Sequence, residues 1–319
     1  MRSDMDSRKK VTVLVPAYNE AGQLPALHAE LRRMVAASGV AYGWEFLVVD
    51  DGSTDDTQAV LRQLRAEDPR LRYVTLSRNF GKENALMAGF DYATGDCVVM
   101  MDSDLQHPVD VIPAMLREWE AGYDDVYGRR LSRGREPFVR RRLTMAYYRL
   151  LQSSTRIDVL AEMGDFRLLD RRCVDAMRAL RENSRYTKGL LGWIGYRKKG
   201  VDYTPDERYG GKSRFSYRKL VNLAAEGICG FSTSPLRATT LLGLAVALGA
   251  FVYILFVLCK TLIWGESVQG YPTLMCVILF LGGCQLTAIG IIGEYIGRIY
   301  NETKRRPPYI ADNVNGEKV

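Results

Sequence analysis

Two aspartates behind a short apolar run are the residues of this sequence best suited to chemistry. Residues 98–101 predict a buried strand, and Asp102 and Asp104 follow it directly. Because side chains alternate along a strand, acids at these two positions would face the same way. Such a pair can bind one hard divalent cation, Mg²⁺ or Mn²⁺, together with the oxygens of a phosphorylated substrate. Gln106 falls on the same face and could add an amide oxygen, although a strand that ends in an ordinary polar turn would carry the same residues.

Other polar residues that could bind a nucleotide also follow predicted strands. In open α/β sheets, ligands gather beyond the carboxyl ends of the strands. Carboxylates at several strand ends make sense if a metal joins some of them to a diphosphate while the others bind ribose or base hydroxyls. The sequence contains neither a P-loop motif nor a Gly-x-Gly-x-x-Gly motif that would suggest a different phosphate site. The residues are Tyr18 and Glu20 after the apolar run 11–15, and Asp51 after the run 45–49.

The elements that position these residues alternate between strand and helix patterns. Short apolar runs are separated by stretches with apolar residues at helical spacing. This alternation predicts an α/β domain over residues 1–215 with an open, mostly parallel sheet. The predicted strands are 11–15, 45–49, 71–76, 98–101 and 125–128, and the predicted helices include 23–37, 111–121 and 171–180.

Residues 129–215 are more basic and less regular than the segment before them. Arg129 and Arg140 belong to arginine runs that could contact phosphate, although a charge run is usually a solvated face. Lys212 and Arg214 lie in a glycine- and serine-containing stretch, which has the composition of a loop that closes over phosphate.

One acid in this region stands among apolar neighbours. Asp165 precedes the predicted helix 171–180, and it is either a turn residue or a residue that reaches a substrate. The two histidines, His28 and His107, have no metal-ligand spacing, and we expect structural roles for them.

The last third of the chain has the pattern of a membrane hairpin. Two almost uncharged segments, 238–262 and 271–294, are each long enough to cross roughly 30 Å of hydrocarbon. Residues 216–234 predict an amphipathic helix in the membrane interface. Basic residues flank the pair of segments but not their connector, so the positive-inside rule places both termini in the cytoplasm, with 301–319 as a cytoplasmic tail. No apolar signal segment stands at the start of the sequence.

Charge and small-residue spacing suggest the partners. The 319 residues carry a net charge of +7, which suits anionic lipid or a phosphorylated substrate; we expect no nucleic-acid partner. Gly293 and Gly297 have the small-x-x-x-small spacing that packs helices together, and it could join copies in a homo-oligomer.

A metal–diphosphate site tied to the bilayer suggests the transfer of an activated group to a lipid. A nucleotide sugar fits as donor, because a metal would neutralise the departing diphosphate. A lipid phosphate fits as acceptor: with its second pKa near about 6, it would already be mostly ionised. Such an acceptor needs no strong general base, which agrees with a site rich in acids and arginines.

Four ordered motifs resemble the family-2 glycosyltransferases. They are Val-Pro-Ala-Tyr-Asn-Glu (15–20), Val-Val-Asp-Asp-Gly-Ser (48–53), Arg-Asn-Phe-Gly-Lys (78–82) and Met-Asp-Ser-Asp-Leu-Gln-His-Pro (101–108). The resemblance is strongest to the branch with dolichyl-phosphate mannose synthase and the bacterial polyprenyl-phosphate (bactoprenol) glucosyltransferases. The tail motifs Ile-Gly-Glu-Tyr-Ile-Gly-Arg-Ile-Tyr (292–300) and Arg-Pro-Pro-Tyr (306–309) resemble the bactoprenol enzymes, which carry two carboxyl-terminal spans.

The resemblance implies a GT-A fold, a UDP-sugar donor and inversion at the anomeric carbon, giving a polyprenyl-phosphate sugar at the bacterial inner membrane. It implies that Asp104 and Asp165 are the catalytic residues, with Asp165 more suited by charge to orient a substrate than to take a proton. Asp102, Asp104 and Gln106 would hold Mg²⁺ or Mn²⁺. The implied nucleotide-sugar residues are Pro16, Tyr18, Glu20, Asp51, Lys82, Asp102, Ser103, Asp104, Gln106 and Arg129, and the implied lipid-phosphate residues are Arg140, Lys212 and Arg214.

The donor sugar stays open at this point. Glucose is the preferred sugar, and an aminoarabinose-type sugar or an N-acetylhexosamine would use the same fold. GDP-mannose is less favoured, because Asp-Phe-Arg at 165–167 departs from the Ser-Gly-Phe type of the mannose synthases. The alternative of another class is a membrane scaffold with a dead transferase domain, but such a copy would be expected to lose Glu20, Asp102 or Asp104.

Overall fold

The protein is described by a computed structural model that covers residues 8–38, 41–130, 163–183, 185–204 and 270–319, with single residues between 236 and 263. Contacts divide the chain into two compact units. The first, here called the sheet unit, comprises Met1–Val221 and Pro307–Val319, and the second comprises Asn222–Arg306. The chain therefore leaves the sheet unit once and returns to it at its carboxyl end.

The centre of the sheet is parallel, as the strand–helix alternation predicts. Its strands are almost continuously apolar because helices cover both of their faces. In the register, Leu14 lies opposite Leu47 on one side and Met100 on the other. The central strands, in spatial order, are β4 (Cys97–Met100), β1 (Lys10–Ala17), β2 (Gly43–Asp50) and β3 (Leu71–Leu76).

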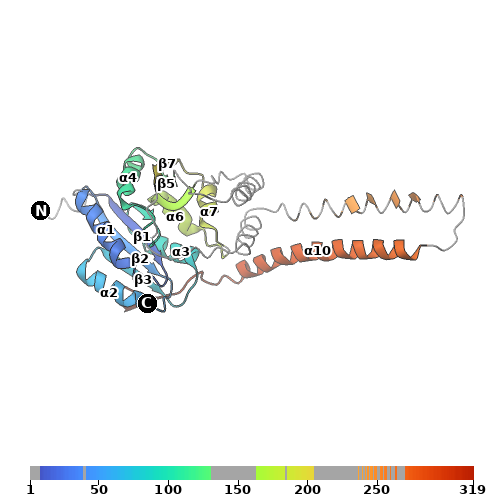
Figure 1. The fold of residues 1–319 in the computed structure, drawn as a ribbon, viewed down its shortest axis with the longest axis horizontal. Coiled ribbons are helices and arrows are strands. Elements are labelled where there is room, and N and C mark those ends of the chain that lie inside the picture. Colours follow the sequence, from blue (N-terminus) through green and yellow to red (C-terminus); the bar gives the residue numbers. More distant parts are fainter. Residues whose placement is uncertain are drawn as a thin grey trace. The chain divides into compact units, whose positions relative to one another are not determined.

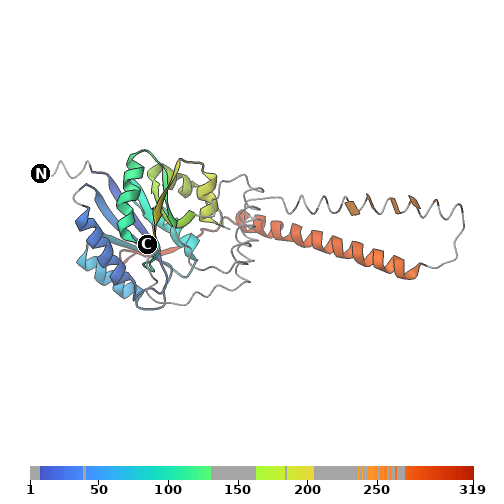
Figure 2. The ribbon, with the colours of Figure 1, turned by 45° about the horizontal axis from the view of Figure 1, so that its top comes forward.

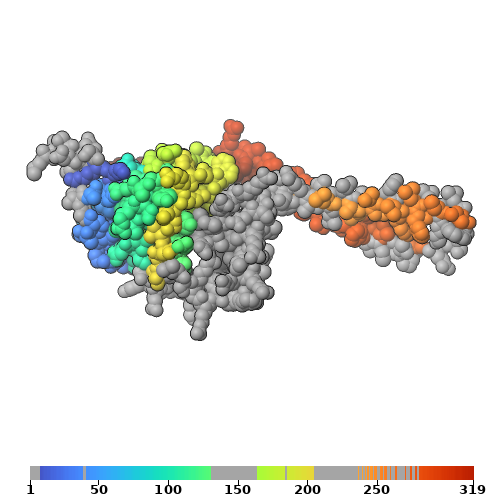
Figure 3. Space-filling view, turned by 90° about the horizontal axis from the view of Figure 1, so that it is seen from above, coloured from blue at the N-terminus to red at the C-terminus, as the bar shows by residue number. Residues whose placement is uncertain are grey.

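Beyond this centre the sheet is mixed, which differs from the mostly parallel sheet that we predicted. β6 (Met163–Asp170) lies antiparallel between β4 and β5 (Asp125–Arg130), and β7 (Lys198–Tyr203) pairs parallel with β5. Figure 3 shows the green and yellow segments of these strands side by side at the surface. The sequence patterns predicted no strand over residues 163–170, where the structure has β6.

Helices cover both faces of the sheet (Figures 1 and 2). On one face, odd-numbered residues of β1 such as Val11 and Val13 pack in one core with Leu27 and Leu61. On the other face, Gly89 lies so close to Leu14 that an added Cβ would clash with its side chain. The first face carries α1 (Leu24–Ala37), α2 (Thr57–Glu67), the short 3₁₀ helix η1 (Val109–Val111) and α4 (Ile112–Glu120); the second carries α3 (Lys82–Tyr92) and α6 (Arg171–Ala179).

The last residues of the predicted tail 301–319 form strands of the sheet, which the sequence analysis did not predict; the cytoplasmic location of the tail stays a prediction. β8 (Ala311–Val314) pairs antiparallel with β3, and β9 (Glu317–Lys318) pairs with β8. The Ser77 amide donates to the Ile310 carbonyl (2.9 Å), and the Asn315 side chain accepts from the Tyr73 amide (3.0 Å). The end of the chain thus closes the edge of the sheet beside β3.

The second unit contains one long described helix, α10 (Tyr271–Thr303). By length and composition, residues 280–303 of this helix could cross a membrane, and among the described residues no other helix meets that test. One turn apart on this helix, Arg298 donates a hydrogen bond to Glu294 at 2.9 Å. The predicted interfacial helix 216–234 and most of the predicted span 238–262 lie outside the described residues.

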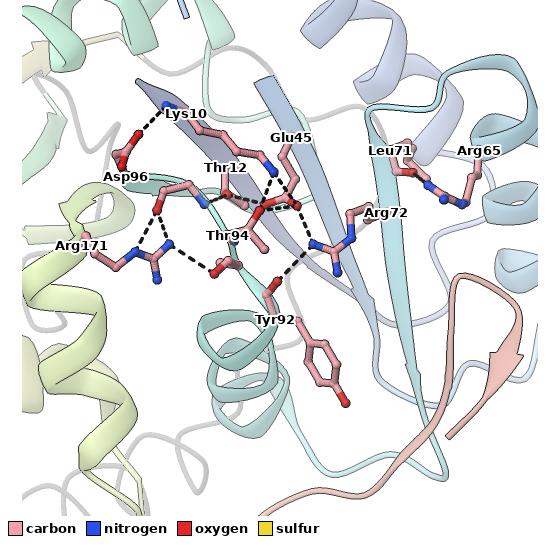
Figure 4. A network of polar contacts seen from close by, with 12 residues as sticks. Lys10, Thr12, Glu45, Arg65, Leu71, Arg72, Tyr92, Thr94, Asp96 and Arg171 are labelled. Carbon is pink, nitrogen blue, oxygen red and sulfur yellow. Dashed lines mark hydrogen bonds and ion pairs between the residues drawn. The ribbon is translucent and has the colours of Figure 1, made fainter. Parts of the chain in front are cut away.

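A polar network ties together the amino ends of β1, β2 and β4, away from the carboxyl ends where ligands are expected (Figure 4). Glu45, 2% exposed, accepts hydrogen bonds from Thr12, Thr94 and Arg72. Burial alone would raise the pKa of Glu45, but these hydrogen bonds outweigh it and lower the pKa to about 2. The buried carboxylate is therefore charged and fully engaged in holding the strands.

Candidate active site

A cavity of ≈ 390 Å³ opens at the carboxyl ends of β1, β2 and β4. Its position is the one that an α/β sheet offers to ligands. The structure brings together most of the predicted nucleotide-sugar residues in its wall: Pro16, Tyr18, Glu20, Asp51, Lys82, Asp102, Ser103 and Asp104 line it, together with Ala17, Asn79, Gly81 and Ala85.

Side chains lock the loops that form this cavity to one another. Asn19, with a positive φ of 57°, accepts a hydrogen bond from the Thr54 amide, and its own amide donates to the Ser53 hydroxyl. Gly52 also has a positive φ, 64°, and a Cβ there would lie 2.3 Å from the Arg78 backbone. Only glycine permits this close approach, so the turn after β2 packs directly on the loop after β3.

Asp51 lines the cavity and also stabilises a neighbouring loop. Its two carboxylate oxygens accept hydrogen bonds from the backbone amides of Phe80 (2.7 Å) and Gly81 (2.8 Å). The side chain therefore fixes the loop before α3, which carries the cavity residues Asn79 and Lys82. Its predicted contact with ribose or base would be made by a carboxylate that is already held in place.

The two aspartates lie in a turn and not on the strand, because β4 ends at Met100. The strand alternation that we expected to align them does not operate, yet both Asp102 and Asp104 line the cavity. Leu105, with a φ of 59°, reverses the chain after them. The Gln106 side-chain nitrogen donates to Asp104 at 2.8 Å, so in this structure Gln106 supports Asp104. Its role as a direct metal ligand stays a prediction.

His107 stabilises the turn that contains Asp102 and Asp104. Its Nδ1 accepts a hydrogen bond from the Asp102 amide (3.2 Å), and its ring stacks on Phe166 with centroids 5.0 Å apart. Burial lowers the pKa of His107 despite the nearby aspartates, which agrees with a neutral ring that accepts at Nδ1. The structural role that the sequence suggested for His107 is therefore a specific one.

The acids of the cavity fit a divalent cation. Burial, and then the charge of Asp104, raise the pKa of Glu20, because neighbouring carboxylates disfavour a further negative charge. A cation held by Asp102 and Asp104 would relieve this repulsion. Mg²⁺ and Mn²⁺ commonly combine one or two carboxylates with substrate phosphate oxygens, and the Asp102–Asp104 pair suits that kind of site.

A row of alternating charges leads from the cavity along β6 and α7 (Thr187–Trp193). Lys82 Nζ lies 2.6 Å from Asp102 Oδ1 and 2.9 Å from Asp165 Oδ2, and Lys188 Nζ lies 3.1 Å from Asp165 Oδ1. Burial would raise the pKa of Asp165, but the ammonium groups of Lys188 and Lys82 hold it well below its ordinary value. Asp165 is thus a charged residue of a strand and not the turn residue that was the simpler interpretation.

The remaining predicted residues are not brought into the cavity. Arg129 is exposed at the end of β5 and donates two hydrogen bonds to Asp202 on β7, and it does not line the cavity. The three predicted lipid-phosphate residues, Arg140, Lys212 and Arg214, lie outside the described residues.

Comparison with known proteins agrees with this geometry. The sequence pattern described as glycosyl transferase family 2 matches residues 12–178, and the pattern described as the GtrB C-terminal hairpin matches residues 234–299. The chain is 41% identical to the bactoprenol glucosyl transferase of Shigella phage SfV, over 95% of this chain and 98% of that protein. It is 40% identical to the prophage bactoprenol glucosyl transferase homolog of Escherichia coli (strain K12), over 96% and 99%.

The chain belongs to glycosyl transferase family 2. The relatives of this glycosyltransferase include the putative glycosyltransferase CsbB of Bacillus subtilis (strain 168), which is 40% identical over 96% of this chain and 92% of its own length. Among solved structures, the glucosyl-3-phosphoglycerate synthase of Mycobacterium tuberculosis, solved with Mn²⁺, UDP-glucose and phosphoglyceric acid, has a TM-score of 0.50 at 20% identity. It covers 69% of this chain and 78% of its own, and it shows the shared GT-A fold.

The structure also reveals site residues of this glycosyltransferase that the sequence analysis did not single out. Lys188 reaches Asp165 from α7, and Asn79 lines the cavity from the loop after β3. Asn79 belongs to the motif 78–82, which was a usable signal. Lys188 has no distinguishing sequence pattern, and its ion pair with Asp165 on β6 became visible only in the structure.

Proposed function

We propose that this glycosyltransferase moves glucose from UDP-glucose to a polyprenyl phosphate, with inversion at the anomeric carbon. The observation that carries the proposal is the similarity over nearly the whole chain to bactoprenol glucosyl transferases, combined with a cavity that keeps Glu20, Asp102 and Asp104. A bactoprenol acceptor and a glucosyl group are what the names of those relatives state.

In this proposal the cavity residues bind the donor. Pro16, Tyr18 and Asp51 line the part of the cavity next to β1 and β2 and would contact uridine and ribose. Asp102 and Asp104 would hold Mg²⁺ or Mn²⁺, and such an ion, when bound, stabilises the negative charge of the departing diphosphate. Lys82 adds a fixed positive charge on the same wall.

No residue is required to take a proton from the acceptor. A phosphate monoester has a second pKa near about 6 and is mostly ionised at neutral pH. Asp165 has both carboxylate oxygens engaged by lysines, so its role is to orient charges at the site. This supports the prediction that it acts without abstracting a proton.

The fold of the sheet unit supports the proposed membrane arrangement. β8 is hydrogen-bonded to β3, so the carboxyl terminus lies on the same side of any membrane as residues 71–76. A membrane-inserted segment between Asn222 and Arg306 would therefore cross an even number of times, in agreement with the predicted two-span hairpin and with both termini in the cytoplasm. Assembly into a homo-oligomer stays a prediction.

The proposal is tested by measuring the transfer of a labelled sugar from the nucleotide sugar to the lipid. Membranes that contain the protein are incubated with labelled UDP-glucose, polyprenyl phosphate and either Mg²⁺ or Mn²⁺, and organic extracts are counted. We expect a labelled lipid product that Asp104→Asn reduces by about a hundredfold or more, because a lost metal ligand removes several kcal/mol of charge stabilisation. Parallel reactions with labelled UDP-N-acetylhexosamines and GDP-mannose test the sugar. Product from another donor but not from UDP-glucose would correct the sugar, and no product from any donor would contradict the proposal.

A further inference from the structure

We propose that Lys188 binds the phosphate of the lipid acceptor, and that Asp165 positions Lys188 and Lys82 so that one lysine faces the acceptor phosphate and the other the donor diphosphate. This inference rests on the proposed function. It assigns a phosphate-binding residue within the described part of the chain and gives Asp165 a positioning role.

Asp165 forms an ion pair with each of the two lysines. Asp165 offers one carboxylate oxygen to each lysine, Oδ2 to Lys82 and Oδ1 to Lys188, at 2.9 and 3.1 Å. One carboxylate thus sets the separation of two ammonium groups. Lys82 lines the donor cavity, and Lys188 does not, so the row extends from the donor site to a position beside it.

A further contact joins the two helices that carry these lysines. Lys82 is the first residue of α3 and Lys188 is the second residue of α7. The Thr187 amide donates to the Glu83 carboxylate at 2.8 Å, so the residues next to the two lysines are also tied together. Leu190 and Leu191 are 1% exposed and anchor α7 in the core.

Both lysines remain accessible to a ligand. The side chains of Lys82 and Lys188 are 41% and 32% exposed, so phosphate oxygens can reach them. An ammonium group has three donors, and a carboxylate contact leaves room for phosphate. A cation bound by Asp102 would take over the oxygen that Lys82 now contacts, and Asp165 would then keep Lys82 in place.

The competing role for Asp165 is that of a general base. A base needs a carboxylate oxygen that is open to the acceptor and a proton affinity high enough to accept its proton. Each oxygen of Asp165 already contacts an ammonium group. The geometry therefore favours positioning, and the two roles give different kinetics.

The test separates donor binding from acceptor use in the full-length protein in detergent. Titration calorimetry measures the Kd of UDP with Mn²⁺, and steady-state assays at saturating UDP-glucose measure kcat and the KM for polyprenyl phosphate. We expect Lys188→Met to raise the acceptor KM by about tenfold or more and to leave the Kd of UDP unchanged, whereas Lys82→Met weakens UDP binding by about tenfold or more. Asp165→Asn should impair both. Lys188→Arg, which keeps the charge, should recover much of the acceptor affinity.

Lys199→Met is the matched control, because Lys199 lies over the Tyr123 ring and not at the cavity. An unchanged acceptor KM in Lys188→Met would overturn the inference. The inference would also be overturned if Asp165→Asn lowered kcat alone and removed one limb of the pH–rate profile, because that is the behaviour of an enzyme that has lost its general base.

A measurement on the unmodified chain keeps the inference testable if a variant does not fold. Acylation of lysines, read by peptide mass spectrometry, should be slowed at Lys188 by polyprenyl phosphate and at Lys82 by UDP with Mn²⁺. Lack of protection at Lys188 in a preparation that makes lipid product would overturn the inference. A preparation that binds UDP but makes no lipid product from any donor would instead contradict the proposed function.

Discussion

At the scale of single residues, the cavity residues are positioned by hydrogen bonds from neighbouring side chains. Asp51 fixes the loop that carries Lys82, Gln106 supports Asp104, and His107 accepts from the Asp102 amide. Such supporting contacts restrict the acids to one arrangement before any ligand arrives, which reduces the entropy that binding would cost.

His107 offers a direct test of this support. His107→Phe keeps an aromatic ring to stack on Phe166 but removes the acceptor for the Asp102 amide, so we expect metal affinity to fall by roughly tenfold. Mn²⁺ binding followed by electron paramagnetic resonance gives the Kd. His107→Asn restores an acceptor oxygen near the position of Nδ1 and should bind Mn²⁺ more tightly than the Phe variant. Equal affinities in both variants and the unaltered protein would show that the contact is dispensable.

At the scale of elements, the carboxyl-terminal strands protect the edge of the sheet. β8 covers the backbone groups of β3, and Tyr309 before it donates a hydrogen bond to Asp91 at 2.7 Å, where Arg181 also binds. An uncovered edge strand is a template for pairing with another chain. The last residues of the protein are therefore part of its fold, although they follow α10 in sequence.

Deletion of residues 311–319 should leave one edge of β3 unpaired, the edge that β8 now covers. We expect a lower midpoint of thermal unfolding and a shift toward aggregates in size-exclusion chromatography. The deletion removes the hydrogen bonds between β3 and β8 and those between β8 and β9. Glu317→Gln, a change at an exposed position of β9, is the control and should behave as the unaltered protein. A deleted protein that stays monodisperse with the same midpoint would show that β8 contributes nothing to stability.

The polar network around Glu45 predicts a pH dependence of stability. The folded-state pKa of about 2 lies below the ordinary value of 4.5, so the contribution of Glu45 is complete above pH 4.5 and is lost as the pH falls toward 2. This linkage corresponds to roughly 3 kcal/mol. Glu45→Gln should lower the unfolding free energy at neutral pH and flatten its decline between pH 4.5 and 2, measured by urea unfolding in detergent. The same slope in both proteins would mean that other groups control acid stability.

At the scale of the whole molecule, the second unit is an insertion within the fold of the first. The chain leaves the sheet unit after Val221 and re-enters it at Pro307. β8, which follows this insertion in sequence, is hydrogen-bonded to β3, which precedes it, and this cannot occur across a bilayer. The topology of the hairpin is thus constrained by the sheet as well as by flanking charges.

Reporter fusions after Val319 test this constraint. We expect a carboxyl-terminal green fluorescent protein to fluoresce and a carboxyl-terminal alkaline phosphatase to be inactive in bacterial cells, because the terminus stays with the sheet unit, for which we propose a cytoplasmic location. A fusion in the connector between the predicted spans, near residue 267, should give the opposite result. Active phosphatase at the carboxyl terminus would exclude an even number of crossings with a cytoplasmic sheet unit.

The sequence by itself determined the parallel centre of the sheet, its helices and most of the cavity wall. These features are set by local patterns: apolar runs, helical spacing and short motifs that each place their residues at a strand end. Glu20, Asp51 and Asp102 lie where their motifs predict because each follows its own strand within a few residues.

The tertiary structure alone decided the mixed outer sheet, the return of β8 to β3 and the ion pairs of Asp165. Each depends on contacts between segments far apart in the chain, such as Lys82 with Asp165, 83 residues later. Local residue patterns do not encode which distant strand becomes the neighbour, because that choice depends on how all the elements pack. For the same reason no local pattern indicates that Arg129 pairs with Asp202 on a distant strand; its role at a phosphate stays a prediction.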